Sequence, residues 1–270
     1  AEARLTDAVR LSEGAGAALS QAEAIRELAL LYYDQGRNLE ALGHLTQAHR
    51  LFSRLSARRE LVDVDTKVRS LEDTYLAVVK DWGQSIESAD SYTHGHCERV
   101  ATFGSLVAEY LGVEAIGART IRLGAYLHDL GKVRVPPEIL NKPDRLTAAE
   151  FAIVKRHPVW GVEMLAEVDF PWDLKPIIRW HHERLDGTGY PDGLTGEGIP
   201  LDAQIICIVD VWDAVTTTRS YRSAMSLDRA LAIMAESRHW WRPEVYRAFL
   251  EVVPCRRGDS NPHGLAPTAP

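Results

Sequence analysis

The residues of this chain best suited to chemistry are a series of histidines and aspartates. Neutral imidazoles and carboxylates bind divalent ions such as Mn, Fe or Zn. Seven such ligands are more than one tetrahedral or octahedral ion needs once water takes its share. Two ions that share a bridging carboxylate would use them all, and such an ion pair is typical of hydrolytic sites. The seven residues are His96, His128, Asp129, His157, His181, His182 and Asp210.

Two motifs contain most of these residues. The first is His128-Asp129-Leu130-Gly131-Lys132, and the second is His181-His182-Glu183-Arg184 followed by Asp186-Gly187-Thr188-Gly189-Tyr190-Pro191. On these motifs the chain resembles the HD-GYP family, a subgroup of the HD metal-dependent phosphohydrolases. Members of that family hydrolyse the bacterial messenger cyclic di-GMP. The resemblance runs from about residue 82 to residue 250. The His-Asp pair alone would be read more readily as a helix cap with a buried histidine.

The resemblance implies two sets of ligands, His96, His128, Asp129 and Asp210 for one ion and Asp129, His157, His181 and His182 for the other. Asp129 would bridge the two ions. Neighbouring side chains in a helix diverge by about 100°, so His181 and His182 can face one ion only near a helix end. The Asp-Gly and Gly-Tyr-Pro residues that follow would supply that end. Asp213, one turn after Asp210, is interpreted as a hydrogen-bond acceptor beside the ligands.

The residues before His96 indicate how many metal ions the site should bind. Some family members bind a third ion through a glutamate about one helical turn before the first histidine. Here Thr93 and Tyr92 occupy those positions, and Glu87 has the wrong offset. We therefore expect two divalent ions, with Fe or Mn favoured and other divalent ions open.

The expected substrate contacts lie in and after the same motifs. Lys132 could place an ammonium against a phosphate oxygen, and Arg184 offers a planar guanidinium suited to phosphate or a guanine edge. Arg219, Tyr221 and Arg222 resemble the family's Arg-x-Tyr-Arg segment, which faces the ligand. A basic cluster at a helix end is an alternative that is nearly as well supported. The candidates for substrate binding are Lys132, Arg184, Asp186, Tyr190, Arg219 and Arg222.

The resemblance implies a cyclic di-GMP phosphodiesterase that yields pGpG, GMP or both. A water that bridges two cations loses its proton near neutral pH and would be the nucleophile, with Asp129 and Lys132 as the catalytic residues. One alternative is a phosphodiesterase-like signalling scaffold that acts through protein contacts with little catalysis. Another is an HD hydrolase of a different phosphate ester. Degenerate family members usually lose ligands or the Gly-Tyr-Pro triplet, and this chain has all of them, which favours the enzyme.

The composition limits which partners and which cellular compartment we expect for this chain. The net charge is −7, and no block is rich in lysine or arginine, so a nucleic-acid polymer is not an expected partner. No apolar run approaches the ~20 residues of a membrane span. Three widely separated cysteines fit a reduced, cytoplasmic compartment. The chain begins with Ala, so it is expected to be a fragment, and a homodimer is left open.

The predicted fold is all-α, with an HD-domain helical bundle preceded by a helical-repeat region. The first ~75 residues are mostly helix formers. Leu5-Thr6-x-Ala8-x-Arg10-Leu11 recurs 40 residues later as Leu45-Thr46-x-Ala48-x-Arg50-Leu51. Residues between these copies fall where a tetratricopeptide repeat places its packing residues and its turn glycine: Leu28, Ala29, Tyr32, Gly36, Ala41, Leu45 and Ala48. A plain helical hairpin or a coiled coil is the alternative. Protein partners are expected to bind these repeats and the Gly-Tyr-Pro loop, and the repeats to regulate the enzyme.

The remaining organisation is read from helical spacing. Residues 61–88 should form a helix that leads into the catalytic domain. A capping box at Thr147 and Glu150 should start a helix, and Pro158 suits a first turn. The expected domains are 1–75, 76–255 and a disordered tail at 256–270. Helices of the catalytic domain are expected at 95–111, 115–130, 147–156, 158–167, 173–184, 201–218, 227–237 and 243–252.

Overall fold

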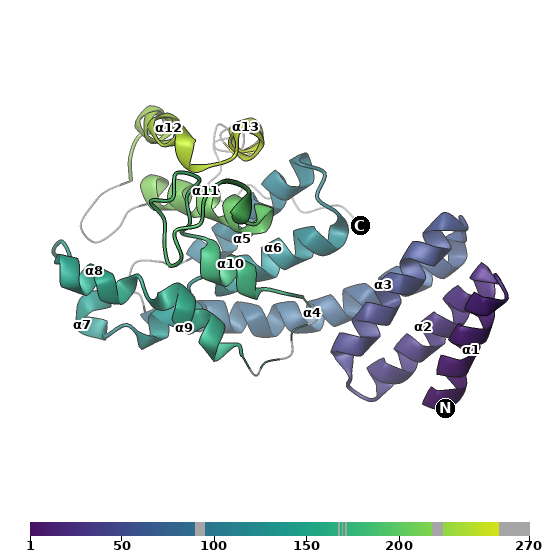
Figure 1. The fold of residues 1–270 in the computed structure, drawn as a ribbon. Coiled ribbons are helices and arrows are strands. Elements are labelled where there is room, and N and C mark those ends of the chain that lie inside the picture. Colours follow the sequence, from purple (N-terminus) through teal and green to yellow (C-terminus); the bar gives the residue numbers. More distant parts are fainter. Residues whose placement is uncertain (90–94, 167, 169, 171, 218–223, 254–270) are drawn as a thin grey trace. The chain divides into compact units, whose positions relative to one another are not determined.

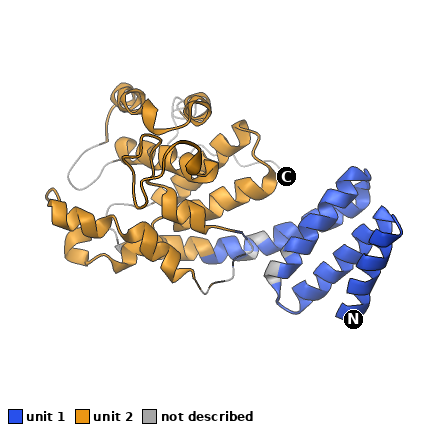
Figure 2. Cartoon of the chain, viewed as in Figure 1, with its two compact units in different colours: residues 1–78, 169–172 blue, residues 79–168, 173–270 orange. Residues whose placement is uncertain are grey.

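The structure is a computed structural model that describes residues 1–89, 95–166, 168, 170, 172–217 and 224–253. In these residues the regular structure is helical, apart from an isolated bridge between Asp186 and Thr195. The predicted all-α fold is confirmed. The chain forms two compact units, residues 1–78 with 169–172 and residues 79–168 with 173–270 (Figure 2). Among the described residues, the search for a helix that could cross a membrane finds none.

The first unit is built from α1 (Glu2–Gly14), α2 (Ala18–Asp34), α3 (Asn38–Arg54) and the start of α4 (Arg58–Ala89). Small alanines let neighbouring helices approach closely, and Ala29, Ala41 and Ala48 are fully buried. Gly36 has a φ of 72° in the turn between α2 and α3, a backbone angle that glycine adopts without strain. The expected packing positions are therefore buried, and the tetratricopeptide assignment stays a prediction.

Helix α4 contributes to both units and covers the linking helix predicted at residues 61–88. Val64 and Leu71 lie in the core of the first unit, and Val79 and Ile86 in that of the second. In the first unit, the ring of Tyr75 meets the buried Trp172 edge-on, with centroids 5.6 Å apart. A short segment nearly a hundred residues away in sequence thus completes the first core.

The second unit is built around a central helix, α11 (Leu201–Thr216). Most residues of α11 are buried, on nearly every side of the helix. A helix that is apolar all round belongs in the interior. Around it lie α5 (His96–Tyr110), α6 (Ala115–Leu127) and α10 (Lys175–Trp180), with α9 (His157–Met164) against α10 (Figure 1). The remaining elements are η1 (Leu130–Arg134), α7 (Pro137–Leu140), α8 (Ala148–Val154), η2 (Gly196–Gly198), α12 (Leu227–Glu236), η3 (Arg238–Trp240) and α13 (Pro243–Val252).

The predicted helix starts are closer to the structure than the predicted ends. The capping box of Thr147 and Glu150 is present, and Pro158 lies in the first turn of α9. The prediction was wrong at the ends of α6 and α10, which stop at Leu127 and Trp180 instead of residues 130 and 184. The short helix α7 was not predicted. The expected tail at 256–270 lies outside the described residues.

Candidate metal centre

The candidate ligands are carried mainly by the ends of helices. His96 and His157 are the first residues of α5 and α9, and His128 and His181 directly follow the last residues of α6 and α10. Asp210 projects from the body of α11. These helices pack together in the second unit (Figure 1). Neighbouring side chains point about 100° apart only within a regular helix. Because α10 ends at Trp180, His181 and His182 lie beyond it and both belong to one group of candidate ligands.

Asp129 lies between two groups of imidazoles. Its Oδ1 is 3.2 Å from Nε2 of His157 and 3.9 Å from Nε2 of His181, whereas its Oδ2 is 3.4 Å from Nε2 of His128. In each group the ligand atoms lie within 4.8 Å of one another, which is close enough for one ion to reach all of them. The groups are Asp129, His157, His181 and His182 on one side and His96, His128 and Asp129 on the other.

Asp210 extends the second group. Its Oδ1 lies 3.5 Å from Nε2 of His96. All seven residues chosen from the sequence are thus brought to one place, and their roles as ligands stay a prediction. Thr93 and Tyr92, on which the two-ion expectation rested, lie outside the described residues.

Hydrogen bonds determine which nitrogen of each ring faces the centre. Nδ1 of His128, His157 and His181 lies 2.7, 2.8 and 3.0 Å from the carbonyl oxygens of residues 125, 154 and 178. A carbonyl can only accept, so each Nδ1 carries the proton and donates it. In the neutral rings Nε2 is then unprotonated, with its lone pair directed to the centre. This is the tautomer that a metal ligand requires.

Two close contacts between imidazoles show that this geometry fits a cation. Nε2 of His96 lies 3.3 Å from Nε2 of His128, and Nε2 of His157 lies 3.3 Å from Nε2 of His181. Two lone pairs at this distance repel each other, so each pair of nitrogens needs a positive charge near it, either a proton or a metal ion. Five imidazoles and the carboxylates of Asp129 and Asp210 form a donor set suited to divalent metal ions.

Burial and charge set the protonation of the centre. Burial alone would raise the pKa of Asp129, but Lys132 and His128 hold it well below its usual range, so the carboxylate is ionised. Burial lowers the pKa of His181 and of His182 well below the usual value, so both rings are neutral. Burial also acts to lower the pKa of His128, but Asp129 outweighs it and raises the pKa to about 9. A proton and a metal ion therefore compete for His128.

Comparison with known proteins agrees with this geometry. Residues 83–245 match the family model described as HD domain, which is more than half of the chain. The chain belongs to the HD-domain family. With its Gly-Tyr-Pro motif and relatives named for cyclic dinucleotide hydrolysis, it falls in the HD-GYP group, as the sequence resemblance predicted.

Three relatives illustrate the likeness. The 3'3'-cGAMP-specific phosphodiesterase 3 of Vibrio cholerae is 35% identical over 80% of this chain and 49% of its own length. The cyclic di-GMP phosphodiesterase response regulator RpfG of Xanthomonas campestris is 38% identical over 68% of this chain and 52% of its own. Cyclic di-GMP phosphodiesterase PA4108 of Pseudomonas aeruginosa is 39% identical over 72% and 46%. The chain thus spans about half the length of these relatives.

In this HD domain the residues after the His-Asp pair bring η1 against α9. A Cβ on Gly131 would lie 1.9 Å from the carbonyl oxygen of His157, so only glycine allows this approach. One residue later, Nζ of Lys132 lies 2.7 Å from Oδ2 of Asp129. Lys132 therefore lies next to a candidate ligand, and its catalytic role stays a prediction. Its ammonium is on the same oxygen that faces His128.

Glu183 is a residue of the HD-GYP motif whose role was not predicted. Its side chain is fully buried and accepts hydrogen bonds from the backbone N–H groups of Asp192, Gly193 and Leu194 at 2.7, 3.0 and 3.0 Å. These bonds fold the chain after the Gly-Tyr-Pro residues back onto the end of α10. The sequence does contain a signal for this role. Glu183 stands between the candidate ligands His181 and His182 and the glycine-rich loop that follows them.

The loop itself packs on the ligands. The ring of Tyr190 lies against that of His182 with centroids 4.6 Å apart, and the N–H of Tyr190 donates to the carbonyl of His182. A Cβ on Gly189 would lie 2.5 Å from the backbone nitrogen of Arg184, which explains a glycine there. Tyr190 is thus in contact with the candidate centre through His182.

For Asp186 and Arg184, the contacts in the structure are with residues outside the candidate ligands. Oδ1 of Asp186 accepts hydrogen bonds from the backbone and hydroxyl of Thr188, so this carboxylate holds the turn of the loop. The guanidinium of Arg184 lies over the ring of Trp240, 3.5 Å from its centroid. Arg219 and Arg222 lie outside the described residues.

Asp213 has the role that its spacing indicated. Its Oδ2 accepts a hydrogen bond from Nδ1 of His96 at 2.8 Å, which confirms the interpretation of a hydrogen-bond acceptor beside the ligands. Burial acts to raise the pKa of Asp213, but the hydrogen bonds from His96 and Arg99 lower it to about 2. The buried carboxylate is therefore ionised at neutral pH.

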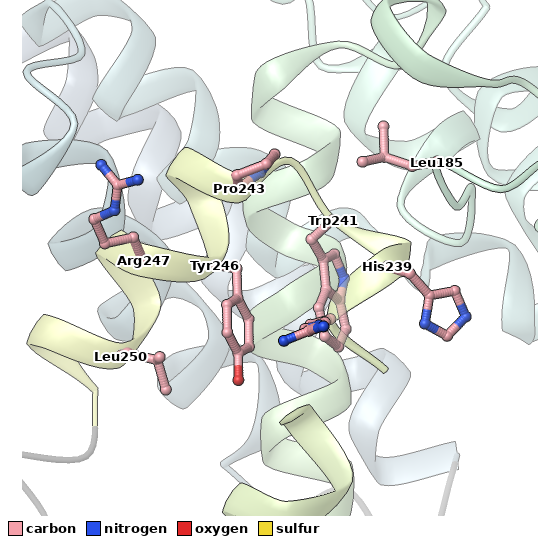
Figure 3. A pocket seen from close by; sticks show the side chains of 8 residues that line it. Leu185, His239, Trp241, Pro243, Tyr246, Arg247 and Leu250 are labelled. Atoms are coloured by element: carbon pink, nitrogen blue, oxygen red, sulfur yellow. The ribbon is translucent and has the colours of Figure 1, made fainter. Parts of the chain in front are cut away.

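The described residues also line a pocket of about 610 Å³ beside η3 and α13, and none of the predicted site residues borders it. Figure 3 shows Trp241 and Tyr246 next to each other in its wall. The planes of their rings differ by 2°. The lining residues are Leu185, Arg238, His239, Trp241, Pro243, Tyr246, Arg247 and Leu250. The pocket is thus separate from the ligand cluster.

Proposed function

We propose that this chain binds two divalent ions and hydrolyses cyclic di-GMP to pGpG, to GMP or to both. The observation that carries the proposal is the position of Asp129, with one oxygen toward His157 and the other toward His128. A carboxylate in that position is suited to bridge two ions. Iron and manganese both suit a mixed set of imidazoles and carboxylates. The substrate class is supported by the names of the relatives RpfG and PA4108.

The residues that would hold the ions form two groups that share Asp129. His96, His128 and Asp210 would serve one ion, His157, His181 and His182 the other, and Asp129 both. Ions held there would supply positive charge for a substrate phosphate and lower the pKa of a water molecule.

The protein's own contribution is to orient these donors and to keep His181 and His182 free of protons. The Nδ1 hydrogen bonds keep the rings in the tautomer that faces the centre, and burial keeps His181 and His182 neutral. Lys132, with its ammonium next to Asp129, is placed to donate to a non-bridging phosphate oxygen, where developing charge is greatest.

Substrate binding is proposed for the residues around the Gly-Tyr-Pro loop. Stacking on Trp240 leaves the N–H edges of Arg184 available for a phosphate or for the acceptor edge of guanine. Tyr190 offers an aromatic face next to His182. Asp186 would act by shaping the loop, since its carboxylate already binds Thr188.

A second candidate substrate is 3'3'-cGAMP. The relative that aligns with the largest share of this chain among the three described is named as specific for that cyclic dinucleotide. Both substrates carry the same phosphodiester linkage and at least one guanine, so the same centre would serve either.

The test is metal analysis of anaerobically purified protein combined with product chromatography from cyclic di-GMP and from 3'3'-cGAMP in separate reactions. We expect two ions per chain and faster turnover of cyclic di-GMP. Faster turnover of 3'3'-cGAMP would select the second candidate. Two bound ions without turnover of either dinucleotide would favour the scaffold alternative. A protein that binds no divalent ion would contradict the site itself.

Regulation is proposed to come from the first unit. Its helices pack against one another through buried alanines, and stacked helices of repeat proteins form extended surfaces that bind partners. The Gly-Tyr-Pro loop is proposed as a second partner surface. Pull-down of a defined partner with the full chain and with a chain lacking residues 1–71 would test the first surface.

A further inference from the structure

His96 differs from the other histidines of the centre in what holds its ring. His128, His157 and His181 each donate Nδ1–H to a backbone carbonyl three residues earlier. His96, like His157, is the first residue of its helix, so its place in the helix does not explain the difference. Its Nδ1 is bonded instead to the side chain of Asp213, at 2.8 Å.

Asp213 is in turn held by Arg99. The guanidinium Nε lies 2.6 Å from Oδ1 of Asp213, and a terminal nitrogen lies 3.0 Å from Oδ2. This is the two-pronged geometry in which arginine fixes a carboxylate most firmly. The Asp213 side chain is only 1% exposed, and a buried carboxylate without such a partner would be strongly unfavourable.

The arrangement links two helices at one ligand. Arg99 lies one turn after His96 on α5, and Asp213 lies one turn after Asp210 on α11. Each helix therefore contributes one candidate ligand and one residue of the supporting pair. A shift of α5 against α11 would disturb the ligands and the pair together.

We propose that Asp213 and Arg99 are positioning residues that fix the ring of His96 for the ion on the His128 side, leaving the ion on the His157 side independent of them. This inference rests on the proposed function, because it takes His96 as a metal ligand. Carboxylates that hold a ligating histidine raise metal affinity about 10- to 100-fold in known sites. The expected consequence is a selective loss of one ion.

The experiment is a titration of the metal-free full chain with Mn²⁺ alone, followed by calorimetry and by electron paramagnetic resonance. The variants are Asp213→Ala, Asp213→Asn, Arg99→Ala and Arg99→Lys. The control is Glu163→Gln, which removes the exposed ion pair between Arg134 and Glu163 in the same unit. Circular dichroism and the Tm establish that each variant is folded.

For Asp213→Ala we expect one of two affinities to fall about 10- to 100-fold while the other stays within about twofold. The exchange-coupled signal of a manganese pair should give way to the signal of an isolated ion. Asp213→Asn keeps an acceptor for His96 and should lie between the wild type and Asp213→Ala. Arg99→Lys should retain more of the affinity than Arg99→Ala, and Glu163→Gln should match the wild type.

The outcomes separate this inference from the function on which it rests. A wild-type chain that binds no Mn²⁺ contradicts the proposed function. A wild-type chain that binds two ions, with variants that bind both equally well, overturns the positioning role and leaves the function intact. Equal weakening of both ions would also overturn it, because the role would then be general and structural. If Asp213→Ala does not fold, the same criteria apply to Asp213→Asn and Arg99→Lys.

Discussion

Oδ1 of Asp129 lies 3.2 Å from Nε2 of His157. The second oxygen of the same carboxylate faces His128 at 3.4 Å, so one side chain is in contact with both groups of imidazoles. These two histidines come from different parts of the chain, His128 directly after α6 and His157 at the start of α9. A single backbone position therefore determines the spacing of the centre.

Replacing Asp129 should remove both ions. Asp129→Ala takes one oxygen from each group, and we expect less than one ion per chain by metal analysis and no measurable hydrolysis of cyclic di-GMP. The fold should persist, since the helices keep their packing. Two ions per chain with near-normal turnover would show that the ligands are assigned wrongly.

Lys132 should affect turnover more than metal content. Lys132→Ala is expected to keep both ions and to lower kcat by roughly 10²-fold or more, the scale of a lost group that stabilises developing charge. Metal analysis and steady-state kinetics on one preparation test both statements. Unchanged kinetics would mean that the ammonium serves only Asp129, at 2.7 Å.

Glycine at position 131 should be required for folding of the centre. Gly131→Ala would place a methyl group 1.9 Å from the carbonyl oxygen of His157, so η1 and α9 must separate. We expect a loss of about 1–3 kcal/mol in the free energy of unfolding and weaker metal binding. Gly198→Ala is the control, because nothing lies within 4 Å of its Cβ. The control should change stability by less than about 0.5 kcal/mol.

Glu183 should hold the segment after the Gly-Tyr-Pro residues. Glu183→Gln replaces an acceptor oxygen by an NH₂ group that faces backbone N–H donors. We expect a loss of about 1.5–3 kcal/mol and faster hydrogen exchange at the amides of residues 192–194. The exposed Glu197, in the same loop, is the matched control. Equal exchange rates in Glu183→Gln and Glu197→Gln would contradict this role.

Deletion of residues 1–71 should leave the centre intact. None of the candidate ligands lies in the deleted part, and Tyr75 remains to cover Trp172. We expect metal content and basal hydrolysis to survive while partner binding is lost. A folded, soluble truncation that binds no metal would show that the first unit helps to build the site.

The candidate ligands could be predicted from the sequence because the motifs specify them residue by residue. The ends of α6 and α10 could not, since apolar periodicity continues through Leu127 and Trp180. Directly after α10, the chain is held by contacts that helical periodicity does not describe, such as those of Glu183 with the amides of residues 192–194. The pairing of Tyr75 with Trp172 likewise joins segments that no local pattern connects.

The contrast between carbonyl and carboxylate partners has an evolutionary consequence. Every amino acid supplies a backbone carbonyl, so sequence drift at residues 125, 154 and 178 leaves the acceptors of His128, His157 and His181 unchanged. The acceptor of His96 is a side chain, and a single codon change at position 213 removes it. Divergence in metal preference among descendants of this sequence should therefore begin at the His96 half of the centre, and the His157 half should be inherited with little change.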